Sequence, residues 1–108
     1  MIDVDELVRE MAAAASGQLK AKWPAIKDFA ENEFRKLGQT ITFIGEKTAA
    51  GELTEDEARL LLEMQKNAAR AVLLTLEGMA LLAAEAVINA ALDGVKGTVN
   101  AALGFALL

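Results

Sequence analysis

An all-α fold, formed as one helical domain over residues 1–108, is what the sequence predicts, and three observations support it. Proline occurs once, at Pro24, so long stretches of the chain are free to be helical. Apolar residues recur at steps of three and four, which is the period of an amphipathic helix. The one run rich in β-branched residues, 40–44, falls inside such a stripe. At 108 residues the chain has room for a single core.

The first helix is expected over residues 3–22 and the second over residues 24–50. Three acids stand where the positive end of the first helix dipole stabilises them, namely Asp3, Asp5 and Glu6. Pro24 clashes with the preceding turn of a helix but fits the first position of a new one. We therefore expect a kink or a short break at residues 22–24.

A tight turn is predicted around Gly51. Glycine suits the left-handed residue that closes a helix, and Thr54 followed by Glu57 has the spacing of a capping box. The third helix is expected over residues 54–93, which makes a long antiparallel helical hairpin with the second. A short fourth helix, over residues 98–107, is expected to follow.

The hairpin register predicts one specific contact. Counting outward from the turn places Trp23 and Pro24 opposite Gly78, so Trp23 is expected to pack over the gap that Gly78 leaves. The alternative is that Trp23 covers one end of the core and that Gly78 is incidental.

The C-terminal part of the chain is much more apolar than the rest. Of the 27 charged side chains only four follow Arg70, and they are Glu77, Glu85, Asp93 and Lys96. One antiparallel partner covers a stripe of about 100° on a helix, so residues 71–92 need further cover. The other helices of the chain, a second copy or a lipid bilayer could provide it.

Self-association into a homo-oligomer, a dimer or larger, is the favoured source of this cover, because two stacked hairpins form a four-helix bundle. A single membrane span is disfavoured because Glu77 and Glu85 cost about as much as the aliphatic residues return. The predicted oligomer interface consists of Val72, Leu73, Leu76, Met79, Leu82, Val87, Ile88, Leu103 and Phe105.

Composition excludes several kinds of chemistry. The chain has no histidine and no cysteine, which excludes disulfides, imidazole bases and the usual zinc ligands. Its net charge of −5 repels nucleic acid. No catalytic constellation, metal site or cofactor site is expected, and the protein is predicted not to be an enzyme. The first ten residues are acidic and polar, so no cleavable signal is expected. A cytoplasmic location is expected as a consequence.

Two polar groups of residues have a functional and a simpler interpretation. The residues Glu77, Glu85, Asn89 and Asp93 form a polar thread that could line a channel or bind a hard cation, although a solvated stripe is favoured. Trp23 is flanked by Lys20, Lys22 and Lys27, a combination found at membrane surfaces and nucleic-acid patches. Ordinary ion pairing of these lysines with Asp28, Glu31 and Glu33 is favoured.

Two classes of function therefore remain. The leading prediction is a non-enzymatic helical self-assembly or protein-interaction protein, such as a scaffold or an adaptor. The alternative is a membrane-interacting, pore-forming or lipid-coating protein that places residues 71–92 and 95–108 against lipid.

Overall fold

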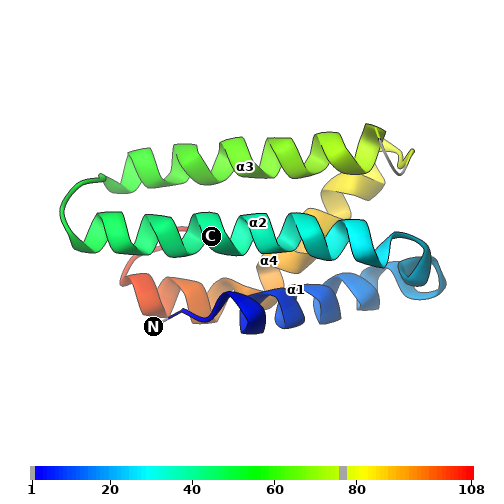
Figure 1. Ribbon diagram of the computed structural model, residues 1–108, viewed down its shortest axis with the longest axis horizontal. Helices are drawn as coiled ribbons and strands as arrows, with labels where there is room; N and C mark the ends of the chain where they lie inside the picture. Colours follow the sequence, from blue (N-terminus) through cyan, green and yellow to red (C-terminus); the bar gives the residue numbers. More distant parts are fainter. Residues whose placement is uncertain (1, 76–77) are drawn as a thin grey trace.

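The computed structural model describes residues 2–75 and 78–108, and helices are its regular structure throughout those residues. The elements are α1 (Val4–Leu19), the 3₁₀ turn η1 (Lys20–Lys22), α2 (Trp23–Ala49), α3 (Glu55–Thr75) and α4 (Leu81–Leu103). The first three α-helices run up and down along the long axis of a molecule that measures 42 × 22 × 18 Å (Figure 1). Helix α4 crosses behind α2 and packs mainly on α1.

The connection between α1 and α2 is a full reversal of the chain at residues 20–22, so the helices are separated by a break and not by a kink. Helix α1 ends at Leu19, and Lys20, the first residue of the 3₁₀ turn, takes a positive φ of 53°. Pro24 then lies in the first turn of α2, where its missing N–H has no helical partner to lose. The two helices lie antiparallel as a result (Figure 1).

The turn between α2 and α3 is built as its local sequence indicates. Gly51 has a φ of +75°. The backbone N–H of Glu57 donates to Thr54 Oγ1 at 3.1 Å, and the backbone N–H of Thr54 donates to Glu57 Oε1 at 2.9 Å. These two reciprocal bonds are a capping box, and they begin α3 beside the end of α2.

The predicted long helix over residues 54–93 is divided in the structure. Gly78 has a φ of +62° and Ala80 is extended, and this segment turns the chain so that α4 folds back over the bundle. A left-handed glycine costs little, which makes Gly78 a suitable place for the break.

The predicted short helix over residues 98–107 is also wrong, because α4 continues through Gly94 and Gly97 to Leu103. A glycine inside a helix costs about 1 kcal/mol relative to alanine, which close packing can offset. The helix ends at Gly104, whose φ is +80°.

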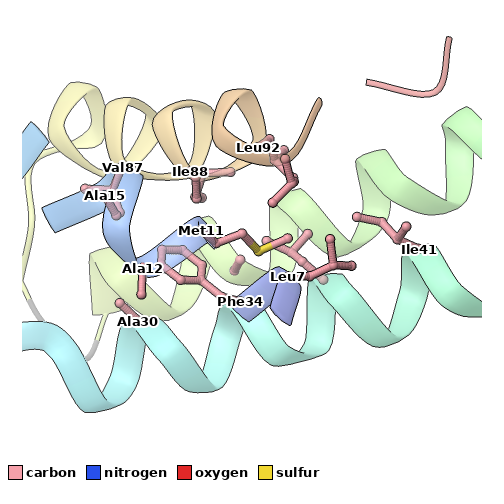
Figure 2. Packing of buried hydrophobic residues seen from close by; sticks show 14 of the residues in the cluster. Leu7, Met11, Ala12, Ala15, Ala30, Phe34, Ile41, Val87, Ile88 and Leu92 are labelled. Carbon is pink, nitrogen blue, oxygen red and sulfur yellow. The ribbon is translucent and has the colours of Figure 1, made fainter. Parts of the chain in front are cut away.

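The core lies between all four helices. Figure 2 shows Met11 of α1, Phe34 of α2 and Ile88 of α4 directed into it. The largest fully buried side chains are Phe34, Leu7, Met11, Leu37, Ile41, Ile44, Leu73, Val87, Val95 and Val99. Every α-helix contributes to this set, so the fold depends on all of them.

The predicted contact between Trp23 and Gly78 is not formed. The Trp23 ring stacks on Phe34, with centroids 6.3 Å apart and an interplanar angle of 11°. A Cβ built on Gly78 would meet no atom of the described residues within 4 Å. Trp23 therefore covers one end of the core, while Gly78 has the positive φ described above and is not incidental.

Candidate interaction surfaces

The residues predicted to form an oligomer interface mostly serve the core of their own chain. Leu73, Val87 and Ile88 are buried. Three more pack partly buried against the same core, namely Met79, Leu103 and Phe105. Val72 is half-buried, Leu82 is 79% exposed, and Leu76 lies outside the described residues. Burial of the first group within the chain means that those side chains cannot also present an interface unless the bundle opens.

Helix α4 is covered because small residues let α1 approach it closely. A Cβ added at Gly94 would lie 2.8 Å from Ala14 Cβ and 3.3 Å from the backbone oxygen of Glu10. Ala15 of α1 and Val87 of α4 are both fully buried in the core that Figure 2 shows. Beyond the first turn of α4, its large apolar side chains are buried or half-buried. The premise that this helix leaves a wide apolar face uncovered is therefore wrong.

The residues after α4 fold back and complete this cover. Asn100 Oδ1 accepts hydrogen bonds from the backbone N–H groups of Leu107 and Leu108, each at 3.0 Å. Arg59 of α3 donates to the carbonyl oxygen of Ala106 at 3.1 Å and lies over the Phe105 ring. Leu107 is buried as a result, which closes the core at this point.

An apolar surface remains on α3, at the edge of the bundle (Figure 1, top). Leu60 is 62% exposed and Met64 is 59% exposed. Steps of four, four, three and four connect the exposed residues of this stripe, which we call the α3 outer face: Leu60, Met64, Ala68, Ala71 and Thr75.

The α3 outer face is uncharged from residue 58 to residue 75. The charged residues of this part of α3 point instead toward α4, where Glu63, Lys66 and Arg70 line a groove shared with Glu85 and Asn89. Surface helices ordinarily direct charged residues away from the core, so an uncharged outer face is the reverse of the expected pattern.

A shallow groove between α2 and α3 borders this face. Its volume is about 510 Å³, and it is lined by Lys36, Gln39, Thr40, Phe43, Leu61, Met64 and Gln65. Phe43 is 49% exposed, and Lys47 Nζ lies 5.6 Å from its ring centroid. Lys36 pairs with Glu33 at 3.0 Å and Lys47 pairs with Glu52 at 2.9 Å, so acids balance the lysines here.

The described members of the predicted polar thread lie along the groove between α3 and α4. Glu85 pairs with Arg70 at 3.1 Å, while Asn89 and Asp93 are exposed, and Glu77 lies outside the described residues. Within residues 2–75 and 78–108, no three His, Cys, Asp or Glu side chains are grouped so that they could hold a metal ion. Glu85 thus pairs with a base of α3 while Asn89 and Asp93 face solvent, which is the arrangement of a solvated stripe.

The lysines around Trp23 do not form the ion pairs expected of them. Lys20, Lys22 and Lys27 are exposed, and none of them has an acidic partner within 4.0 Å in the part of the chain that the structure describes. Glu33, one of the expected partners, is buried and binds Lys36 instead.

A cleft with a volume of about 790 Å³ lies at the α2–α3 turn, beside the end of α4. Its two α2 threonines are already used, because Thr42 and Thr48 donate to the backbone oxygens of Gly38 and Ile44. No buried side-chain nitrogen or oxygen in the described chain lacks a hydrogen-bond partner. The hydroxyl hydrogens of these two threonines are therefore already engaged within α2.

Comparisons with known proteins identify no relative of this chain, so the surfaces described above are interpreted from their geometry. The chain matches no protein-family model, no curated protein and no solved structure. Among the described residues, no helix is both long and apolar enough to cross a membrane.

Proposed function

We propose that this protein is a non-enzymatic helical interaction protein that self-associates through the α3 outer face. The observation that carries the proposal is the exposure of Leu60 and Met64 on a helix side that has no charge over residues 58–75. Large apolar side chains gathered on one exposed face are typical of protein–protein contact.

A second copy of the chain is the partner that this face fits best. In a two-fold interface each surface meets an identical surface, so any net charge on it would face itself. The α3 outer face avoids that repulsion because its residues are all uncharged. Ala68 and Ala71 are small, which allows the axes of two helices to approach closely.

The proposed interface differs in place from the interface predicted by composition. It lies on α3 and the adjacent edge of α2, with Phe43 and Leu61 at its border. Among the described residues of the interface that was predicted from composition, Val72 lies on the side of α3 that faces this border. The burial of Val87, Val95 and Val99 argues against the lipid-coating alternative, since the core would have to open.

Size-exclusion chromatography with light scattering tests the proposal over protein concentrations from about 1 μM to about 1 mM. We expect the wild-type mass to rise from one chain to two. The double variant Leu60→Glu/Met64→Glu places like charges on facing surfaces, so it is expected to stay monomeric at concentrations where the wild type pairs.

The matched control is Gln18→Glu/Thr98→Glu, which adds the same charge at two exposed positions outside α3. This control should associate as the wild type does. A wild type that is monomeric over the whole range contradicts the proposal, and so does equal association of the Leu60→Glu/Met64→Glu variant.

A further inference from the structure

Two parts of the chain lie at one end of the bundle. Because successive helices run antiparallel, the turn from α1 to α2 and the first turn of α4 are at the same end of the long axis (Figure 1, right). We call this the lysine–leucine end, and its defining residues are Lys20, Lys22, Lys27, Leu81 and Leu82. It is a different surface from the α3 outer face.

The basic part of this end is concentrated in sequence and unpaired in space. Between Glu10 and Asp28 the charged residues are Lys20, Lys22 and Lys27. Residues 16–28, which include Asp28, carry a net charge of +2, whereas the whole chain carries −5. Since the three lysines are exposed and without acidic partners in the described chain, their charge is available to an external anion.

The apolar part of this end is the first turn of α4. Leu82 is 79% exposed, more than any other large apolar side chain of the described residues, and Leu81 is 50% exposed. Residues 78–84 have no charged side chain. Exposed leucines and unpaired lysines at the same end of a molecule are a combination that can bind the interface of an anionic membrane.

We infer that the lysine–leucine end docks on an anionic lipid surface. The lysines lie at the level of the phosphate and carboxylate headgroups, and Leu81 and Leu82 enter the upper acyl region. This contact is peripheral, in accord with the absence of a membrane-spanning helix from the described residues. A nucleic acid would bind the lysines but would leave the leucines in water, so the juxtaposition favours lipid.

Vesicle flotation tests the inference with the full chain. Vesicles of phosphatidylcholine containing phosphatidylserine should carry the wild-type protein, and vesicles of phosphatidylcholine alone should not. Raising the ionic strength from about 0.05 M to about 0.5 M should release it, because salt screens the lysines.

Two variants separate the two parts of the surface. Each lysine near an anionic surface contributes about fivefold in affinity, so Lys20→Gln/Lys22→Gln/Lys27→Gln should bind roughly 100-fold more weakly. Leu82→Ser should bind roughly tenfold more weakly, and its position in solvent leaves the fold unchanged. The control Lys47→Gln/Lys66→Gln/Lys96→Gln removes the same charge elsewhere and should bind as the wild type does. Circular dichroism establishes that each variant is folded.

Three results would overturn the inference. In the first, vesicles with phosphatidylserine carry no protein even at low salt. In the second, the control variant loses as much binding as the triple lysine variant. In the third, a single-stranded oligonucleotide binds the wild type and Leu82→Ser equally well while vesicles bind neither, which would assign the lysines to nucleic acid.

Discussion

Helices α3 and α4 differ in how far their apolar side chains are exposed, and the difference is the opposite of what their charge contents would predict. Helix α3 has seven charged residues in 21, and α4 has three in 23. Yet α3 leaves Leu60 and Met64 more than half exposed, while Val87, Val95 and Val99 of α4 are completely buried. What a helix exposes therefore depends on where its neighbours lie more than on how apolar it is.

The neighbours of the two helices explain the difference. Helix α4 packs against α1, α2 and α3, and the residues after Gly104 fold back to cover it further. Helix α3 packs against α2 and α4 and has its outer side at the edge of the bundle (Figure 1). An apolar stripe in that outward position is left for a partner.

The largest expected effect is the loss of stability when a charge is placed at Val87, compared with the same charge at Leu82. Both residues of α4 were predicted to belong to one interface. Val87→Asp buries an unpaired carboxylate in the core and should cost about 4 kcal/mol or more in free energy of unfolding. Leu82→Asp places the same group in solvent and should change the free energy of unfolding by no more than about 0.5 kcal/mol. Urea denaturation measures both, and similar losses would contradict the assigned burial.

A smaller effect is expected where α4 meets α1. Gly94→Ala adds a Cβ 2.8 Å from Ala14 Cβ, so we expect a net loss of about 1–2 kcal/mol in stability. Gly97→Ala is the matched control, since a Cβ there meets nothing within 4 Å. It should stabilise α4 by about 0.5–1 kcal/mol. Thermal unfolding distinguishes the two signs, and a gain in both variants would mean that α1 is not in close contact.

The smallest effect is expected at the start of α3. Thr54→Ala removes the side-chain acceptor of the capping box and should cost roughly 1 kcal/mol. The pKa of Glu57 is lowered by its hydrogen bonds with the backbone and then the side chain of Thr54. In the variant this pKa should rise part of the way toward its ordinary value, which NMR titration of the Glu57 carboxyl would detect.

The lowered pKa of Glu57 also predicts how the stability of the Thr54→Ala variant depends on pH. A lowered pKa in the folded state contributes stability that is present at neutral pH and is lost as the pH falls through that pKa. Thr54→Ala should therefore lose less stability on acidification than the wild type does. An equal loss would mean that the Thr54 side chain does not contribute to the lowered Glu57 pKa, since the backbone N–H of residue 54 remains in the variant.

The parts of the fold that the sequence predicts correctly are those set by local chemistry. The all-helical class follows from the period of apolar residues, and the turn at Gly51 with its Thr54–Glu57 capping box follows from hydrogen bonds among neighbours. Each needs only residues within a few positions of one another.

The breaks at the other connections escaped prediction because they depend on distant packing. Gly78 and Gly94 look alike in sequence, yet the first turns the chain and the second stays helical against α1. The α3 outer face was not predicted from the sequence for a related reason. The period of Leu60, Met64 and Ala68 could have been noticed, but only the arrangement of helices shows that this stripe faces outward.

The rate of thiol labelling at a single introduced cysteine tests the central claim most directly, because the chain has no cysteine of its own. A cysteine introduced by Met64→Cys should react quickly in dilute protein and more slowly as the concentration rises and the α3 outer face pairs. A cysteine introduced by Val95→Cys should be protected at every concentration. Rapid labelling of the Val95→Cys variant, or a rate for Met64→Cys that does not depend on concentration, would contradict the account.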